Sequence, residues 1–245
     1  MASLAKRWKR ATKRVTMAWR HRLIAGAPPW LRHVGAMPAT WADMLLVDHG
    51  VFRMVFLNKH ALSPIAFRSA QPAPHQIGAA ARDGIKTIVN LRGERSCGSY
   101  WLERKACARY GLTLVNFQVR SRAAPSKEEL LGARAMLDQV EYPILMHCKS
   151  GSDRAGLMSV LYKHLKLGVP MSDAIHELSL RYGHIRQSDT GILDAFFERY
   201  LTDTREAPME FYEWVDRVYD PAELKAKYVA SGWANRIVNG LLRRE

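Results

Sequence analysis

The sequence predicts an α/β fold with a central, mainly parallel sheet flanked by helices. Two observations lead to this prediction. Short apolar, β-branched runs alternate with helical patterns along residues 85–147, and such alternation places consecutive strands in parallel with helices on both faces. The chain has 245 residues, of which 48% are hydrophobic. This is enough for one ordinary domain with a substantial core, plus extensions.

The elements follow from local patterns. Strands are expected at Ile85–Leu91, Leu112–Val119 and Ile144–His147, the second as a buried strand. Helices are expected at Tyr100–Tyr110, before Gly111, and at Ser126–Val140, which opens with the capping pattern Ser-Lys-Glu-Glu. Further helices are expected at Met171–Tyr182, Thr190–Leu201, Met209–Tyr219 and from Pro221 to the end.

Ten residues from His147 to Gly156 read His-Cys-Lys-Ser-Gly-Ser-Asp-Arg-Ala-Gly and lie between the third strand and a helical pattern. A loop between a strand and a helix N-terminus can turn successive backbone N–H groups inward, and the helix dipole adds positive potential. Ligands of such sheets bind beyond the carboxyl ends of the strands, where this loop lies. The segment therefore predicts a phosphate site.

Cys148 and Arg154 supply the reactive groups of this loop. The positive field favours the thiolate form of Cys148, which is the nucleophilic form. Arg154 can donate two N–H bonds to two phosphoryl oxygens, which Lys does poorly. Gly151 lies where positive φ or close approach to the anion is expected. The loop predicts nucleophilic attack on a phosphate ester, with phosphate binding by Lys149, Ser150, Gly151, Ser152, Asp153 and Arg154.

The segment His147–Arg154 resembles the signature loop of the protein tyrosine phosphatase and dual-specificity phosphatase superfamily, which is His-Cys, five residues and Arg. Phe67–Pro72 and Ile85–Gly93 resemble the opening strands of its atypical dual-specificity branch. The resemblance covers residues 67–200. It implies a phosphocysteine intermediate at Cys148, phosphate binding by loop amides and Arg154, no metal and no cofactor.

Two positions depart from the superfamily pattern. A hydroxyl residue usually follows the arginine and helps the thiolate to leave, whereas this chain has Ala155, so slow breakdown of the intermediate is expected. The usual general-acid Asp comes from an upstream loop, yet Val119–Ser126 contains no carboxylate. Asp153, which matches an Asp of the myotubularin-like lipid phosphatases, is the catalytic candidate; alternatively it only braces the loop. Gln187 is a candidate for positioning the hydrolytic water.

Other polar residues have simpler interpretations. Arg68 and Arg92 are expected in structural salt bridges, with a second phosphate contact as the alternative. Cys97 and Cys107 fit no metal spacing or disulfide framework and are interpreted as ordinary thiols of a reducing compartment, while a regulatory disulfide stays open. The histidines His164, His176 and His184 have no partners at metal-ligand spacing and are interpreted as core or surface residues.

The formal net charge of +14 is concentrated at the beginning of the chain. The basic residues that precede the first acid, Asp43, are Lys6, Arg7, Lys9, Arg10, Lys13, Arg14, Arg20, Arg22 and Arg32. With Trp8 and Trp19 among them and no apolar core of a signal peptide, this arm is expected to bind an anionic membrane. The alternative is a solvated tail.

Trp41–Leu57 is too short and too polar to span a bilayer. It is expected to dock on the domain with one exposed apolar edge, or to lie in the membrane interface. The segment from Pro221 to Arg244 is expected to be a second membrane contact or a packed helix. The predicted regions are a basic arm with an amphipathic segment (1–60), a phosphatase domain (61–205) and a helical extension (206–245).

Three hypotheses follow: a phosphatase of a membrane lipid phosphate, a phosphotyrosine or dual-specificity protein phosphatase, and a catalytically weak phosphate-binding scaffold. The basic arm and Lys149 favour the first. The expected partners are a phosphorylated lipid or protein and an anionic membrane surface. No reading helix or aromatic platform indicates nucleic acid. The expected location is the cytoplasm, peripheral on the inner face of the membrane.

Overall fold

The computed structural model describes residues 38, 40–48 and 50–229. Its sheet has the strand order β1-β2-β5-β3-β4, in which β1 pairs antiparallel with β2 and the other neighbours are parallel. The strands are β1 (His60–Ser63), β2 (Ala66–Ala70), β3 (Thr87–Asn90), β4 (Thr113–Asn116) and β5 (Ile144–Cys148). The prediction of a mainly parallel α/β sheet is confirmed.

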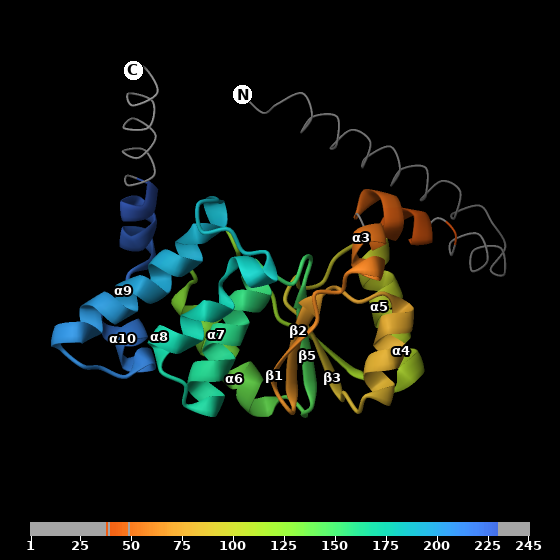
Figure 1. Cartoon of the computed structure of the whole chain (residues 1–245), viewed down its shortest axis with the longest axis horizontal. Coiled ribbons are helices and arrows are strands. Elements are labelled where there is room, and N and C mark those ends of the chain that lie inside the picture. The colour runs from red at the N-terminus through yellow and green to blue at the C-terminus, as the bar shows by residue number, and fades with distance from the viewer. Residues whose placement is uncertain (1–37, 39, 49, 230–245) are drawn as a thin grey trace, which may run out of the picture.

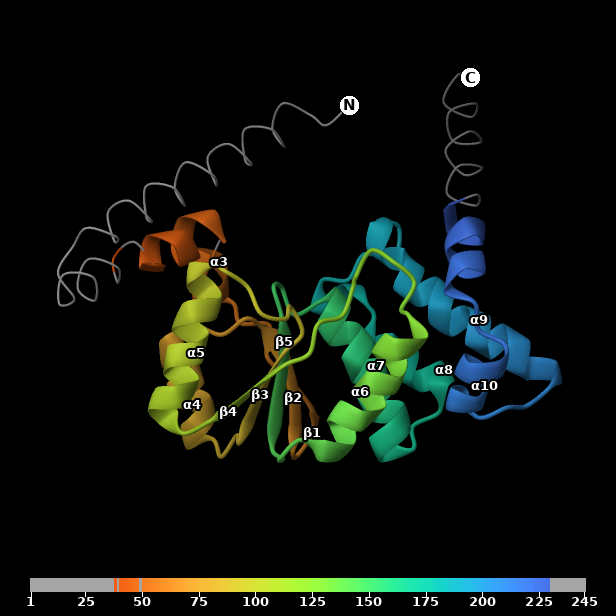
Figure 2. The same ribbon diagram turned by 180° about the vertical axis from the view of Figure 1, so that it is seen from behind.

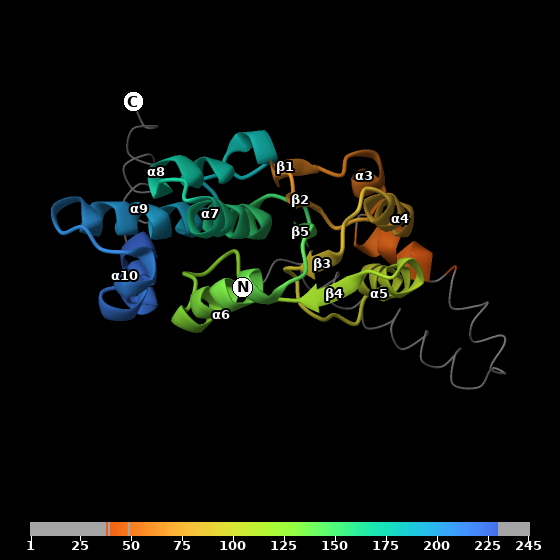
Figure 3. The ribbon, with the colours of Figure 1, turned by 90° about the horizontal axis from the view of Figure 1, so that it is seen from below.

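Helices cover both faces of the sheet (Figures 1 and 3). One face carries α4 (Pro74–Arg82) and α5 (Gly98–Tyr110), and the other carries α6 (Lys127–Gln139) and α7 (Asp153–Leu167). Beyond α6 and α7 lies an outer layer of helices, also visible from behind in Figure 2. These helices are α8 (Met171–Ala174), α9 (Ile192–Glu206), α10 (Phe211–Arg217) and the helical stretch 221–229.

The larger core lies between the sheet, α6 and α7 and extends to the outer helices. Phe196, Phe211 and Trp214 are each at most 1% exposed and pack their rings together. A smaller core lies under α4 and α5 and includes Ile77 and Ile88. The aromatic cluster anchors the C-terminal helices on the domain because removing this apolar surface from water is the main stabilising contribution.

The central strand β5 positions the functional residues. All five of its residues are buried, because Ile144, Leu145 and Met146 face helices on both sides of the sheet. The strand ends at Cys148, and α7 begins at Asp153 directly after a short turn. The helix α6 begins after Ser126, as predicted by its capping pattern, with Ser126 Oγ accepting from the amide of Glu129.

Two predicted elements differ from the structure. The strand expected at Leu112–Val119 is the edge strand β4, half-buried or exposed along its length because it has β3 as its single neighbour. The helix expected at Met171–Tyr182 is broken into α8 and two short turns, η2 (Ile175–Glu177) and η3 (Leu180–Tyr182). It breaks where Glu177 uses its backbone oxygen and its carboxylate to bind Arg68.

The segment Trp41–Leu57 forms a π-helix, η1 (Asp43–Val47), and α3 (Gly50–Val55). Met44 and Arg53 are buried against the domain, while Val55 and Phe56 are 87% and 68% exposed. Docking with one exposed apolar edge is therefore confirmed. At the other end, residues 221–229 pack through Leu224. The basic arm before residue 38 and residues 230–245 lie outside the described residues.

Among the helices of residues 38, 40–48 and 50–229, none combines the length and the apolar character that a membrane crossing requires.

Candidate active site

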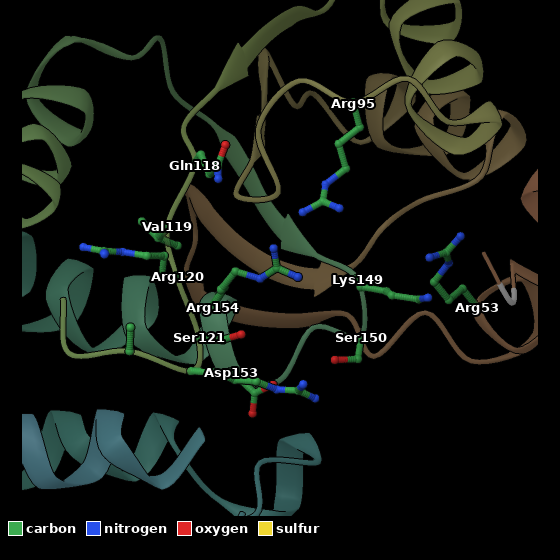
Figure 4. A pocket seen from close by; sticks show the side chains of 12 residues that line it. Arg53, Arg95, Gln118, Val119, Arg120, Ser121, Lys149, Ser150, Asp153 and Arg154 are labelled. Carbon is green, nitrogen blue, oxygen red and sulfur yellow. The ribbon is translucent and has the colours of Figure 1, made fainter. Parts of the chain in front are cut away.

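The signature loop, His147–Arg154, lies at the carboxyl edge of the sheet, between β5 and α7. Cys148, at the strand end, is 2% exposed, and Arg154 is half-buried in the first turn of α7. Lys149, Ser150, Asp153 and Arg154 line a cavity of about 750 Å³ (Figure 4). The predicted loop therefore opens into a cavity at the carboxyl edge of the sheet.

The backbone of the loop is held from outside. Asn58 Nδ2 donates to the oxygen of Ser150 at 3.1 Å, and Arg68 Nη2 donates to the oxygens of Gly151 and Ser152 at 2.8 and 3.0 Å. In a trans peptide the N–H of the next residue points opposite to the carbonyl. Three outward carbonyls therefore leave three consecutive amides facing the other side, which is the arrangement of an anion nest.

Gly151 is required by this packing. Its φ is +77°, and a Cβ there would lie 2.6 Å from the backbone nitrogen of Ala70 and 2.7 Å from the carbonyl carbon of Ser69. A side chain would meet both a strained backbone conformation and the backbone of β2. From the sequence, positive φ or a close approach to the anion was predicted at Gly151. The structure confirms the positive φ, and the close approach that it shows is to the backbone of β2.

Arg154 has no ion pair with a carboxylate among the described residues. Burial lowers the pKa of its guanidinium, and the charges of Arg92 and Arg95 lower it further against the attraction of Cys148. An arginine still remains protonated at neutral pH, since its ordinary pKa is above about 12. The guanidinium is thus a desolvated cation that is available to an anionic ligand.

Asp153 is tied to a buried histidine. His184, 1% exposed, places Nδ1 2.8 Å from Asp153 Oδ1 and Nε2 2.7 Å from Asp194 Oδ2. Burial opposes protonation of His184, but the bonds to both carboxylates raise its pKa to about 9. Burial also disfavours the charged form of Asp153 and so raises its pKa. Hydrogen bonds from His184 and Thr190 outweigh this effect and bring the pKa of Asp153 below its ordinary value. Near neutral pH the proton therefore resides on His184.

The two upstream arginines form structural salt bridges, which confirms the interpretation from sequence. Arg68 is fully buried, pairs with Glu177 at 2.8 Å and stacks on Tyr182 with 4.1 Å between its Cζ and the ring centroid. Arg92 donates to both oxygens of Asp48, at 2.7 and 3.0 Å. Both guanidinium groups are therefore engaged by protein carboxylates.

Asp48 joins the N-terminal segment to the signature loop. It pairs with Arg92, with Arg53 at 3.1 Å and with Lys149 at 3.2 Å. Although burial raises its pKa, the bonds from Arg92 and the nearby positive charges hold it well below its ordinary value. Sequence reasoning missed this role, because Asp48 is far along the chain from Arg92 and Lys149.

A second buried carboxylate lies next to the residue that precedes the nucleophile. Glu103 of α5 contacts the His147 ring and accepts from Gln71 Nε2 at 2.7 Å. Both Glu103 and His147 are fully buried. Sequence reasoning did not predict this pairing or the His184 network, since the residues are far apart along the chain.

The remaining predicted residues lie away from these contacts. Gln187 is exposed and does not line the cavity. Cys97, Cys107 and Cys148 are free thiols, and burial raises the pKa of Cys107 to about 12. In the described part of the chain, no group of three or more His, Cys, Asp or Glu side chains is arranged to hold a metal ion.

Comparisons with known proteins agree with this geometry. A family profile described as "DSP-PTPase phosphatase fused to NAD+ Kinase" matches residues 58–191, more than half of the chain. The dual specificity protein phosphatase TpbA of Pseudomonas aeruginosa strain UCBPP-PA14 is 26% identical over 123 residues, which are 50% of this chain and 53% of TpbA. This chain thus spans about half the length of the curated relatives it matches.

The fold was compared with solved structures as well. The crystal structure of P. aeruginosa TpbA aligns with a TM-score of 0.50 and 22% sequence identity, over 62% of this chain and 91% of that chain. At this identity the likeness shows the fold alone. It agrees with the five-stranded sheet and its flanking helices.

Proposed function

The chain belongs to the family of DSP-PTPase phosphatases described as fused to NAD+ kinase, and on this premise we propose that it is a cysteine-dependent phosphomonoesterase with a phosphocysteine intermediate. One observation carries the proposal. Cys148 ends the central strand β5, in the loop that leads to the N-terminus of α7. Arg68 and Asn58 hold the outer carbonyls of this loop, and its last residue, Arg154, forms no ion pair among the described residues.

The reaction has two steps. In the first, the loop amides and Arg154 hold the phosphoryl oxygens while the Cys148 thiolate attacks phosphorus; the S–P bond forms, the P–O ester bond breaks and the leaving oxygen takes up a proton. In the second, water attacks phosphorus and gives a proton back to the group that protonated the leaving oxygen, the S–P bond breaks, and inorganic phosphate and the thiolate are released. Arg154 and the helix N-terminus stabilise the charge in both transition states.

The leaving group receives its proton from Asp153 in this proposal. Because Asp153 is ionised and bonded to a protonated His184, the imidazolium passes a proton to Asp153, and Asp153 passes a proton to the leaving oxygen as the ester bond breaks. Asp194 on the other side of the ring stabilises the histidine in its charged form. The alternative role for Asp153 is to brace the loop through the same bond, and a leaving-group comparison separates the two roles.

The proposed substrate is a membrane lipid phosphomonoester. The cavity beside the loop is lined by basic residues, and one of them, Arg53, belongs to α3. This helix ends at the exposed Val55 and is followed by the exposed Phe56. Apolar side chains beside a basic cavity suit a phosphorylated headgroup with acyl chains alongside. A protein substrate is the second candidate, because the curated relative TpbA is named a dual specificity protein phosphatase.

Phosphate release from purified full-length protein tests the proposal. Lipid phosphates in vesicles, phosphopeptides and an activated aryl phosphate serve as substrates, with the Cys148→Ser protein as the blank. We expect phosphate release from every substrate to vanish in Cys148→Ser. With the unmodified protein, we expect phosphate release from lipid phosphates in vesicles to exceed release from phosphopeptides. Activity that survives in Cys148→Ser contradicts the mechanism, and faster release from phosphopeptides favours the protein substrate.

A further inference from the structure

The cavity beside the signature loop carries more positive charge than one phosphate requires. Its basic lining residues are Arg53, Arg95, Arg120, Arg122, Lys149 and Arg154, against the single carboxylate of Asp153. A bound phosphoryl group is expected to use Arg154 and the loop amides. The remaining cations therefore need another explanation.

Three of these cations contact protein carboxylates. Arg53 and Lys149 both pair with Asp48, at 3.1 and 3.2 Å. Arg120 binds both oxygens of Glu129, at 3.0 and 2.9 Å. Figure 4 agrees, because the Arg120 side chain points away from the cavity centre. Their side chains are thus held by protein carboxylates, although Asp48 offsets only one of the three positive charges that it contacts.

Arg95 and Arg122 remain. Among the described residues, neither forms an ion pair, and both line the cavity. Figure 4 shows the Arg95 guanidinium directed toward that of Arg154, and the charge of Arg95 lowers the pKa of Arg154. Arg95 and Arg122 are both exposed, so an anionic ligand in the cavity can reach them.

Arg95 is placed by its own loop. Its Nε donates to the backbone oxygen of Arg92 at 3.2 Å, which leaves both terminal nitrogens for a ligand. The loop after β3 packs against the loop after β4 at Gly93. There φ is +69°, and an added Cβ would lie 2.8 Å from the Gln118 side chain. The side chain therefore extends from a fixed turn after β3.

Arg122 lies on the loop that follows β4. The amide of Val119 donates to the oxygen of Leu91 at 3.3 Å, and Val119 and Ala124 are 3% and 5% exposed. The Arg120–Glu129 pair holds the same loop to α6. Because β3, β4 and β5 are parallel neighbours, their carboxyl-end loops meet at one edge and bring both arginines to the signature loop.

We infer that the part of the cavity lined by Arg95 and Arg122 is a second anion site, which selects substrates that carry another phosphate besides the one that is cleaved. The guanidinium fork suits a phosphate dianion. This inference rests on the proposed phosphatase function and narrows its substrate to a bisphosphorylated group. The shared chemistry is a polyol with two phosphate monoesters, presented either as a lipid headgroup or as a free soluble compound.

Binding to the full-length Cys148→Ser protein tests the inference without turnover. Isothermal titration compares inositol 4-phosphate with inositol 4,5-bisphosphate, and a second arm compares the matching phosphatidylinositol phosphates in phosphatidylcholine vesicles. We expect the bisphosphate to bind at least about tenfold more tightly. The added substitutions Arg95→Ala and Arg122→Ala should bring this ratio to about one, while Arg95→Lys and Arg122→Lys should leave part of it.

Arg82→Ala is the matched control. Arg82 is an exposed arginine in the last turn of α4, at the opposite edge of the sheet, and its removal should leave the ratio unchanged. Thermal unfolding of each variant checks that it is folded. A tenfold preference that depends on Arg95 and Arg122 in the soluble arm indicates a free headgroup, and one confined to the vesicle arm indicates a lipid source; both support the site.

A ratio near one in both arms overturns the inference, and so does a preference that persists without Arg95 and Arg122. Aryl phosphate hydrolysis by the unmodified chain is measured in parallel. Hydrolysis without a bisphosphate preference means that the second anion site alone is wrong. No hydrolysis of any substrate means that the proposed phosphatase function is wrong.

Discussion

The Nδ1 atom of His184 lies 2.8 Å from Oδ1 of Asp153, so a buried imidazole binds the one carboxylate that lines the cavity. The same ring contacts Asp194 at 2.7 Å. A histidine between two carboxylates is held in its charged form. The state of Asp153 near neutral pH is thus set by a residue from a distant loop, and this relationship leads to the first two predictions.

Asp153→Asn should slow esters with poor leaving groups far more than activated aryl phosphates if Asp153 transfers the proton. A good leaving group scarcely needs protonation, whereas general acid catalysis contributes roughly a hundredfold or more to a poor one. The ratio of kcat/KM for an alkyl and an aryl phosphate checks this. Equal losses on both substrates would assign Asp153 the bracing role.

His184→Asn should destabilise the fold in a pH-dependent way. Because the folded pKa of His184 is raised to about 9, its stabilisation is fully present below the unfolded pKa of about 6.5 and is lost as pH rises through about 9. At lower pH it is lost again as Asp153, whose pKa is lowered, becomes protonated. We expect a difference of about 2 kcal/mol near pH 6.

Urea unfolding of both proteins between pH 5 and about 10 measures this difference. His176→Asn, at an exposed histidine of η2, is the control and should show no such pH profile. A His184→Asn deficit of the same size at pH 6 and above pH 9 would show that lost packing, not charge, is responsible.

Arg154→Lys should be nearly inactive although it keeps the positive charge. Lysine cannot donate two N–H bonds in one plane to two phosphoryl oxygens, and the loss should be about 3 kcal/mol in the barrier, or roughly a hundredfold in kcat/KM. Steady-state kinetics on an aryl phosphate measures it. Activity within a few-fold of the unmodified protein would mean that the guanidinium geometry is not needed.

Ala155 should make breakdown of the phosphocysteine the slow step. Rapid mixing with an activated aryl phosphate should then give a burst of product equal to the enzyme present, and Ala155→Ser should raise the steady-state rate. Serine is preferred to threonine because Ala155 is fully buried and space is small. Without a burst, the first step or product release limits the rate instead.

The exposed edge of α3 should contribute to activity at a membrane. Val55→Ser with Phe56→Ser removes the most exposed apolar side chains beside the cavity, and release from lipid phosphates in anionic vesicles should fall several-fold because interfacial apolar contact is lost. Leu131→Ser, at a 53% exposed residue of α6, is the matched control. Equal rates for both variants would exclude this edge from membrane binding.

The signature loop could be predicted because its reactive parts lie within the one segment His147–Arg154. A cysteine after an apolar run, a glycine and an arginine before a helical pattern need no distant information. The α/β class followed equally from periodicity. The aromatic packing of the C-terminal helices could not be predicted in the same way, because periodicity shows that a helix has an apolar face but does not identify what covers that face.

The support of the loop could not be predicted in this way. Arg68 carried the one usable signal, because an arginine within the apolar strand β2 indicates a buried partner, but only the fold identifies that partner as Glu177. Asp48 and His184 resemble ordinary polar residues in the sequence. The broken helix at Met171–Tyr182 has the same origin, because a tertiary bond outweighs a modest local propensity there.

The sequence by itself therefore determined the fold class, the nucleophile and the phosphate loop, because these depend on short-range order along the chain. Only the tertiary structure decided which cations pair with carboxylates and that Asp153 is bonded to His184. It also decided which arginines line the cavity without an ion pair among the described residues. The physical reason is that charge pairing depends on distance and burial in space, which are set by parallel strands bringing separate loops to one edge of the sheet.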